Sequence, residues 1–390
     1  MEVRRDVAVV LSGGGMNAML LELGFLQRLR ESSLWERIGV YFGTSAGALG
    51  ATMAALDRLD DLERFLYELR AEETFRPTRI WRLPLLGTHD YVLPDTIAAR
   101  LGNPLDLASD LVQAPAEVVV FATDVTQDTR NGVTAERPFE LAYSSRTTPP
   151  QELAQAILAS AAISALVLPL VIDGRVATDG GWVRNFPLLE AYEREDVELV
   201  VAFRYEPRYP LPGSRALRAA VARLRRYSRL PAARAVVAEL EEAAEREQRG
   251  EPAHIVDTLG RLARVAIGRN TELEEQAACA RERSAAELRA LRDDICTLLE
   301  RASLSDIERH RLRAQVLLRF QAARFPHDRV IPRITVSGGS GDVHFGSGWR
   351  KPEAWTHDAK RVLIERGYRL ADEQLRAAEV EPAAQSSASA

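Results

Sequence analysis

The sequence predicts an α/β protein with a mostly parallel central sheet and a large additional helical region. In the first 205 residues, apolar segments of strand length alternate with amphipathic segments of helix length. Strands that are apolar throughout are typical of a parallel sheet covered by helices on both faces. From about Pro210 the composition changes to Ala, Arg, Leu and Glu, which favours helices. A chain of 390 residues can form one large domain or two smaller ones.

The first predicted strand, Asp6–Leu11, is followed by a serine and the three glycines Gly13, Gly14 and Gly15, which we call the glycine turn. An amphipathic helix follows directly. A glycine turn between a strand and a helix leaves several backbone N–H groups unpaired at the helix N-terminus. Such a turn binds negative charge, and in a hydrolase this charge is the oxyanion of a tetrahedral intermediate.

The second predicted strand ends in a Gly-x-Ser-x-Gly elbow. Residues 43–47 read Gly-Thr-Ser-Ala-Gly and lie between a short apolar stretch and a helix-forming run. In a strand–turn–helix context this motif holds the serine in a strained conformation and exposes its Oγ. Ser45 is therefore a candidate nucleophile. Gly43 and Gly47 are expected where a side chain would collide with the strand or the helix.

A third motif, Asp179-Gly180-Gly181, follows a predicted hairpin over residues 170–178. Two glycines allow the backbone after the aspartate to approach another loop closely. A carboxylate at this position could accept the proton of Ser45 directly.

Together these motifs resemble those of the patatin-like phospholipase family. Its three blocks are a glycine-rich oxyanion turn, a Gly-x-Ser-x-Gly elbow and an Asp-Gly-Gly/Ala motif, and residues 13–15, 43–47 and 179–181 match them in that order. Asn185-Phe186-Pro187 also resembles the family's Asn-x-Pro. The resemblance covers roughly residues 6–205 and implies a patatin-like three-layer sandwich.

The resemblance further implies a lipid acyl hydrolase that forms an acyl-enzyme intermediate. In this scheme Ser45 attacks a carboxylic ester bond of a phospholipid or related lipid while Asp179 takes its proton, without a histidine. N–H groups of the glycine turn stabilise the oxyanion. No metal or organic cofactor is expected. The expected partners are the lipid or acyl-ester substrate and a membrane surface contacted peripherally.

One pair of residues departs from the family pattern. After the glycines the family has a basic residue and then a glycine, whereas this chain has Met16 and Asn17. The alternative function is therefore a catalytically weak or inactive protein of the same fold that binds lipid or acts as a scaffold.

Two other interpretations of the same residues fit less well. The glycine turn also fits a Gly-x-Gly-x-x-Ala dinucleotide fingerprint, but the second strand ends without the acidic residue that binds the ribose. Ser45, Asp179 and His344 follow the chain order of an α/β-hydrolase triad. In that fold several strands precede the nucleophile, whereas only about two precede Ser45 here.

Charge and cysteine content restrict the partners and the compartment. The net charge is −5, without the basic excess expected of a nucleic-acid-binding surface. Cys279 and Cys296 lie on one predicted helix, roughly 25 Å apart at about 1.5 Å per residue, and cannot pair with each other. Together with the lack of a signal-peptide pattern, this leads us to expect a cytoplasmic protein, peripheral at a membrane.

Four segments are expected along the chain, and the oligomeric state stays open. They are a catalytic domain over residues 6–205, a helical insertion or accessory region over 210–325, a strand and helix over 326–378 that pack back on the core, and a disordered tail over 379–390. Further expected elements are a helix over 60–72, a loop over 74–95 as a candidate substrate wall, strands over 117–123, 198–203 and 330–336, and helices over 149–162 and 356–378.

Helix boundaries in the helical region are predicted from helix breakers and caps. Pro231, residues 250–252 and Gly268 are expected to interrupt the helices. Capping boxes over 271–274 and 305–308 predict helices that begin near residues 272 and 306.

The segment Ser214–Arg234 carries seven arginines and no acidic residue. We interpret it as an arginine-rich face that packs on the acidic helix that follows, because its apolar stripe is narrow. The alternative is a helix on an anionic membrane surface.

Overall fold

The structure of the chain is a computed structural model. It describes residues 4–77, 89–126, 139–163, 167–206, 221–222, 225–227, 231–249, 255–322, 330–341, 343 and 355–380. His344 of the triad alternative, most of the arginine-rich segment and residues 381–390 of the predicted tail lie outside these residues.

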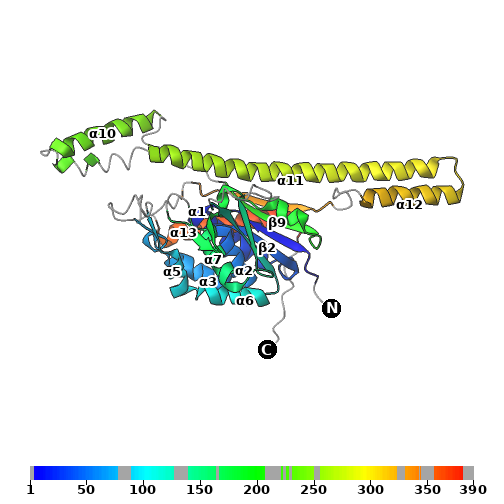
Figure 1. Cartoon of the computed structure of the whole chain (residues 1–390), viewed down its shortest axis with the longest axis horizontal. Helices are drawn as coiled ribbons and strands as arrows, with labels where there is room; N and C mark the ends of the chain where they lie inside the picture. The colour runs from blue at the N-terminus through cyan, green and yellow to red at the C-terminus, as the bar shows by residue number, and fades with distance from the viewer. Residues whose placement is uncertain are drawn as a thin grey trace.

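A mostly parallel sheet of eight strands runs through the centre of the described molecule (Figure 1). The strands are β1 (Val7–Leu11), β2 (Ile38–Thr44), β5 (Glu117–Asp124), β6 (Glu140–Ser144), β7 (Leu170–Ile172), β8 (Arg175–Asp179), β9 (Leu199–Tyr205) and β10 (Arg333–Gly338). Their order is β10-β9-β1-β2-β5-β8-β7, with β6 paired to β5. The pairs from β10 to β5 are parallel, whereas β5–β6, β5–β8 and β7–β8 are antiparallel.

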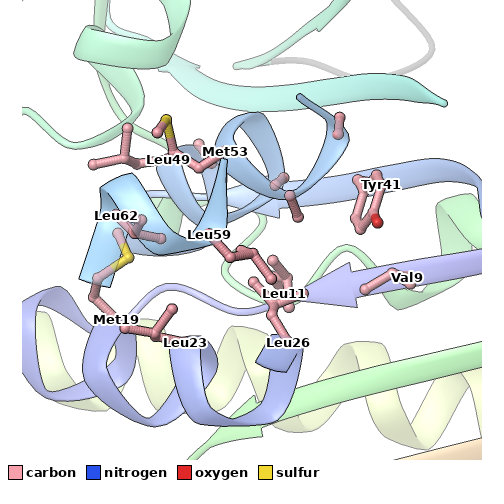
Figure 2. Packing of buried hydrophobic residues seen from close by; sticks show 14 of the residues in the cluster. Val9, Leu11, Met19, Leu23, Leu26, Tyr41, Leu49, Met53, Leu59 and Leu62 are labelled. Carbon is pink, nitrogen blue, oxygen red and sulfur yellow. The ribbon is translucent and has the colours of Figure 1, made fainter. Parts of the chain in front are cut away.

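One face of the sheet is covered by helices from the first 160 residues and by the last helix of the chain. They are α1 (Gly15–Arg30), α2 (Ala46–Ala55), α3 (Leu59–Glu68), α5 (Leu93–Arg100), α6 (Pro104–Gln113), α7 (Pro150–Ser160) and α13 (His357–Ala377). Figure 2 shows the centre of this layer, where side chains of α1, α2 and α3 pack over Val9, Leu11 and Tyr41 of the sheet. Most of the buried apolar side chains lie in this layer. Fully burying a leucine or valine side chain contributes about 1.5–3 kcal/mol to the free energy of folding, so this layer is the main core.

The other face is covered by α8 (Leu188–Glu193) and by the long helix α11 (Ile255–Arg301). Alternate residues of the central strands, such as Val10 and Phe42, point into this second cluster. Ala278 of α11 is fully buried in the same cluster. The predicted fold class, a mostly parallel sheet between helical layers with a further helical region, is confirmed.

The prediction of a helix break at Gly268 and a new start near residue 272 was wrong. Helix α11 is continuous over 47 residues. A glycine inside a helix costs only about 1 kcal/mol relative to alanine, which the packing of a long helix offsets. Thr271 and Glu274 do not cap a helix, because their side chains bind elsewhere. Thr271 Oγ1 accepts from Asn185 Nδ2 in the loop after β8, and Glu274 Oε2 accepts from Leu189 N at the start of α8.

Two further helices flank α11, and Figure 1 shows α12 (Asp306–Ala322) folding back beside the end of α11. The predicted capping box at the start of α12 is confirmed, since Ser305 N donates to Glu308 Oε2 at 3.1 Å and Glu308 N donates to Ser305 Oγ at 3.3 Å. Helix α10 (Pro231–Gln248) begins at the predicted proline. Arg225 forms an ion pair with Glu241 of α10. In the described part of the chain, no helix combines the length and the apolar character needed to cross a membrane.

The C-terminal part of the chain returns to the sheet. Strand β10 pairs with β9, and α13 packs against α1. The two helices approach closely at Gly24 and Gly367, where a Cβ on either glycine would overlap the backbone of the other helix. Lys360 of α13 is buried and donates to Leu69 O, at the end of α3, at 2.6 Å.

Several elements differ from the sequence predictions. The expected loop over 74–95 contains an antiparallel pair, β3 (Phe75–Pro77) with β4 (His89–Tyr91), and its residues 78–88 lie outside the described residues. The helix expected to end at residue 72 ends at Glu68. Strand β6 and helices α5 and α8 are not among the predicted elements because each is short. Helix α6, which begins at Pro104 after the cap residue Asn103, is also not among them.

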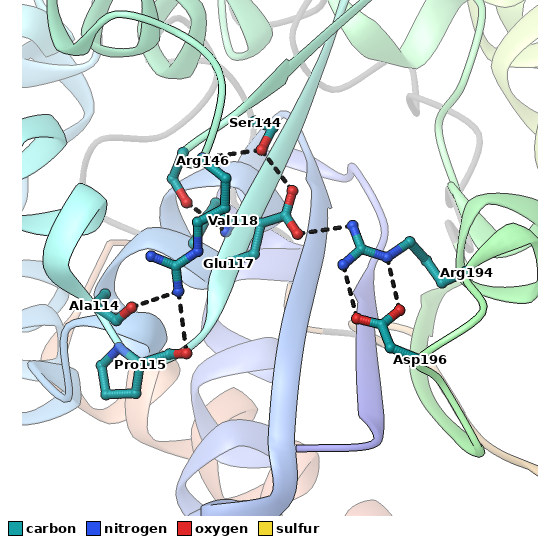
Figure 3. A network of polar contacts seen from close by, with 9 residues as sticks. Ala114, Pro115, Glu117, Val118, Ser144, Arg146, Arg194 and Asp196 are labelled. Atoms are coloured by element: carbon teal, nitrogen blue, oxygen red, sulfur yellow. Dashed lines mark hydrogen bonds and ion pairs between the residues drawn. The ribbon is translucent and has the colours of Figure 1, made fainter. Parts of the chain in front are cut away.

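A polar network fixes the start of β5 (Figure 3). Glu117 accepts hydrogen bonds from Ser144 Oγ of β6 at 2.5 Å and from Arg194 Nη1 at 2.7 Å. Arg194 also binds Asp196, and Arg146 donates to carbonyl oxygens at the end of α6. The network therefore connects β5, β6, α6 and the segment before β9.

One buried carboxyl group in the core carries a testable prediction. Glu22 of α1 is fully buried, and neither carboxyl oxygen has a hydrogen-bond partner in the described part of the chain. Burial raises the pKa of Glu22 well above its ordinary value, so the folded protein holds this proton to a higher pH than the unfolded chain. The free energy of unfolding should therefore fall as the pH rises above the unfolded pKa of about 4.3.

Glu22→Gln keeps the shape of the side chain and removes this ionisation. We expect its free energy of unfolding to fall less than that of the natural protein between about pH 5 and pH 8. Urea denaturation at both pH values measures the difference. If the free energy of unfolding depended on pH equally in the two proteins, a raised pKa of Glu22 would be contradicted.

Candidate active site

The serine of the elbow lies between β2 and α2, in a strained backbone conformation. Ser45 has φ 54° and ψ −118°, in a region that side-chain-bearing residues seldom adopt. Helix α2 begins at the next residue, so Ser45 lies at its N-terminus. A Cβ on Gly43 would overlap Gly47 O, and one on Gly47 would lie 2.6 Å from Leu11 O. The two flanking glycines therefore allow the tight turn.

The side chain of Ser45 meets that of Asp179, although the two are 134 positions apart in the chain. Asp179 is the last residue of β8. Ser45 Oγ donates to Asp179 Oδ2 at 2.7 Å. Both residues are only 6% exposed. The hydroxyl thus has its proton directed at a carboxylate within a mostly buried site.

The environment of Asp179 raises its pKa. Burial raises the pKa of Asp179 to about 6, while hydrogen bonds from Gly181 N–H and Ser45 Oγ act in the opposite direction. The Gly181 bond to Oδ1 measures 2.7 Å. Nearby, burial raises the pKa of Tyr91, and the charge of Asp179 adds to this effect.

The two glycines after Asp179 allow close packing of its loop. A Cβ on Gly180 would overlap Phe121 O of β5. A Cβ on Gly181 would lie 2.9 Å from Asp179 Oδ1 and 3.0 Å from Asn185 Oδ1.

The glycine turn lies directly beside Ser45. A Cβ on Gly13 would be 3.2 Å from Ser45 Cβ, and one on Gly14 would overlap the ring of Tyr205. Gly15, the first residue of α1, has φ 62°, which glycine adopts without strain. Gly13 N donates to Asn185 O at 2.9 Å, so this amide is already engaged. The remaining donors of the turn are the N–H groups of Gly14 and Gly15, at a helix N-terminus where helices leave amides unpaired.

Two side chains to which the sequence motifs assign no role hold the elbow in place. Ser45 N donates to Ser160 Oγ at 2.8 Å, and Ser160 Oγ donates to Phe121 O at 2.6 Å. Thr44 Oγ1 donates to Arg184 O at 2.7 Å. Neither side chain stands out in the sequence: Ser160 ends an alanine-rich helix, and Thr44 occupies a variable position of the elbow motif.

Asn185 connects the glycine turn to helix α11. Besides its carbonyl bond to Gly13, its backbone N donates to Asn270 Oδ1 at 3.2 Å and its Nδ2 donates to Thr271 Oγ1 at 2.9 Å. The family resemblance directs attention to Asn185. Of its partners on α11, Asn270 belongs to no motif, and Thr271 belongs to the predicted capping box, which does not indicate this contact.

A buried cation lies next to this loop. Arg184 is surrounded by three carboxylates from three elements, Glu140 of β6, Glu190 of α8 and Glu274 of α11, at 2.8, 3.2 and 2.8 Å. All four side chains are at most 15% exposed. Arg184 therefore neutralises a group of buried negative charges.

The fold and the site together define an α/β protein with a serine–carboxylate pair at a nucleophile elbow. Residues 9–192 match the family described as Patatin-like phospholipase. Among solved structures, the chain is similar to VipD from Legionella pneumophila, with 16% sequence identity and a TM-score of 0.41, over 96% of this chain and 67% of that one. No curated protein matches the chain in sequence.

Proposed function

We propose that this protein is a lipid acyl hydrolase that cleaves carboxylic ester bonds through Ser45 and Asp179. The observation that carries the proposal is the 2.7 Å hydrogen bond from Ser45 Oγ to Asp179 Oδ2, at an elbow that places the serine at a helix N-terminus. The match of residues 9–192 to patatin-like phospholipases supports a lipid ester as the substrate class.

In the first half of the proposed reaction, Ser45 Oγ attacks the ester carbonyl carbon while its proton passes to Asp179. The carbonyl oxygen becomes an oxyanion, which the N–H groups of Gly14 and Gly15 stabilise, assisted by Ala46 N at the start of α2. The carbon–oxygen bond to the alcohol then breaks. Asp179 returns the proton to the leaving alcohol or lysolipid, which leaves an acyl-enzyme on Ser45.

In the second half, Asp179 takes a proton from water, and the hydroxide attacks the acyl carbon. A second oxyanion forms in the same place and collapses to release the fatty acid. Ser45 regains its proton from Asp179, and the enzyme is restored. A single carboxylate performs both proton transfers in this scheme.

The pH dependence of hydrolysis tests the role of Asp179. As a base it must be ionised, and burial raises its pKa to about 6. The value of kcat/KM should therefore rise about tenfold per pH unit below this value and level off above about pH 7. The substrate should be an uncharged acyl ester, because such a substrate does not itself titrate in the pH range that is measured. A rate that is flat from about pH 5 to pH 8 would contradict a base with this pKa.

The substrate class is tested by hydrolysis of a panel of phospholipids, lysophospholipids and neutral acyl esters, with the Ser45→Ala protein as the blank. Release of fatty acid by the natural protein alone supports the proposal and identifies the preferred head group. Lipid binding without release of fatty acid would favour the alternative, an inactive lipid-binding or scaffolding protein.

A further inference from the structure

Helix α11 touches the loop between Asp179 and Asn185 with two adjacent side chains. Asn270 Oδ1 accepts from Asn185 N at 3.2 Å, and Asn270 Nδ2 donates to Gly181 O at 3.4 Å. Thr271 Oγ1 accepts from Asn185 Nδ2 at 2.9 Å. Thr271 is 7% exposed, so its hydroxyl does not compete with bulk water for this bond.

These contacts lead to the carboxylate of the proposed dyad through Gly181. Asn270 binds the carbonyl of Gly181, and the N–H of the same residue donates to Asp179 Oδ1 at 2.7 Å. This N–H bond lowers the pKa of Asp179 against the effect of burial. A shift of Gly181 would weaken the bond and raise the pKa further.

The same contacts lead to the glycine turn through Asn185. Its carbonyl accepts from Gly13 N, and its Oδ1 lies close to the Cα hydrogens of Gly13 and Gly181. A rotation of the Asn185 side chain would therefore disturb both sides of the proposed site at once.

We propose that Asn270 and Thr271 are positioning residues for the dyad, and that α11 acts through Asn185 on both the Asp179 loop and the glycine turn. The role depends on the proposed function, because without a reaction at Ser45 there is nothing to position. Helix α11 is thus part of the catalytic site and not only an addition to it.

Other contacts hold α11 against the rest of the domain, so the positioning role of Thr271 can be tested separately from the attachment of the helix. Ala278 is buried in the core cluster, Glu274 pairs with Arg184 at 2.8 Å, and Arg281 Nη2 donates to Tyr192 O at 2.9 Å. These contacts stay in place when the Thr271 hydroxyl is removed. Loss of the hydroxyl should therefore change the site without detaching the helix.

The test compares Thr271→Val, which has the same shape without the hydroxyl, with Thr271→Ser, which keeps it. Thr297→Val is the matched control, because Thr297 is an exposed threonine of α11 whose hydroxyl donates to Asp293 O at 2.9 Å, as that of Thr271 donates to Ile267 O at 3.0 Å. Asn270→Ala is the second variant. The readouts are the rate of covalent labelling of Ser45 by a fluorophosphonate from pH 5 to pH 9, kcat and KM for an acyl ester, and the thermal unfolding midpoint.

We expect Thr271→Val and Asn270→Ala to slow labelling and to lower kcat about tenfold with little change in KM, which is the scale of one lost hydrogen bond. The midpoint of the pH profile should move upward in both variants. Thr271→Ser should restore both readouts, and Thr297→Val should match the natural protein. All variants should unfold near the natural midpoint.

Three results would overturn the inference. One is a natural rate and pH midpoint in Thr271→Val, with the natural protein labelled normally. Another is an equal loss in Thr271→Val and Thr297→Val, which would mean a general effect on the helix. If the natural protein itself is not labelled at Ser45, the proposed function fails and the positioning role fails with it.

Discussion

Replacing Ser45 with alanine should lower kcat for acyl-ester hydrolysis by at least about 10⁴-fold, because the proposed acyl-enzyme forms on the Ser45 hydroxyl. The folded structure should be unaffected, since Ser45 contributes one hydrogen bond to Asp179 and its backbone N–H bond to Ser160 is kept. Removal of the serine is also expected to relieve no strain, because alanine must adopt the same positive φ.

Asp179→Asn is the companion change at the other end of the same bond. Asparagine is nearly isosteric but cannot take the serine proton, so we expect a loss of about 10²–10⁴-fold in kcat and no fall in rate near pH 6 on the acid side of the pH profile.

Ser109→Ala provides the control for Ser45→Ala, because Ser109 is an exposed serine whose hydroxyl donates to Leu105 O within α6. Activity in Ser45→Ala close to that of Ser109→Ala would contradict the assignment of the nucleophile.

Arg184→Met should destabilise the folded protein by about 3–5 kcal/mol, the largest stability effect that we expect from any single change. The substitution removes the arginine that pairs with the buried carboxylates of Glu140, Glu190 and Glu274. Burial already raises the pKa of Glu274 and Arg184 lowers it, so loss of the arginine should favour its protonation. Urea denaturation measures the change in the free energy of unfolding.

Arg313→Met is the matched control for the arginine. Its partner Glu300 lies at 3.3 Å, but both side chains are more than half exposed, and such pairs contribute at most about 1 kcal/mol. The loss in Arg184→Met should shrink at low pH, where Glu274 becomes protonated, and also in the double variant that adds Glu274→Gln. A loss in Arg184→Met no larger than that in Arg313→Met would show that the three carboxylates do not depend on the arginine.

The sheet could be predicted from the sequence because its central strands are apolar throughout and their turns contain glycine. Strands β1, β5 and β9 lie within about two residues of the predicted ranges, and β2 lies directly before the elbow, as expected. The antiparallel strand β6 was missed because one face is exposed, and its sequence Glu140–Ser144 shows no strong pattern. Its position depends on pairing with β5, which is a tertiary interaction that a local sequence pattern does not encode.

The meeting of Ser45 with Asp179 follows from motifs, but the side chains that hold them in place do not. Ser160, Asn270 and Thr271 act through hydrogen bonds to neighbours far away in sequence. A single serine, asparagine or threonine on a helix carries no periodic signal, so only the packed structure identifies these residues.

The capping box at residues 271–274 shows how a local rule is overridden by tertiary contacts. The pattern is present, but Thr271 binds the loop after β8 and Glu274 binds the start of α8, so the helix continues through Gly268 and Thr271. The similar pattern at Ser305 has no competing tertiary partner in the described residues around it and caps α12 as predicted.

Mass spectrometry of the protein after reaction with a fluorophosphonate tests most directly whether Ser45 and Asp179 form a catalytic pair. We predict one covalent adduct, on the peptide that contains Ser45, which is absent in Ser45→Ala and forms much more slowly in Asp179→Asn. An adduct on any other residue, or labelling of Ser45 at an undiminished rate in Asp179→Asn, would contradict the account.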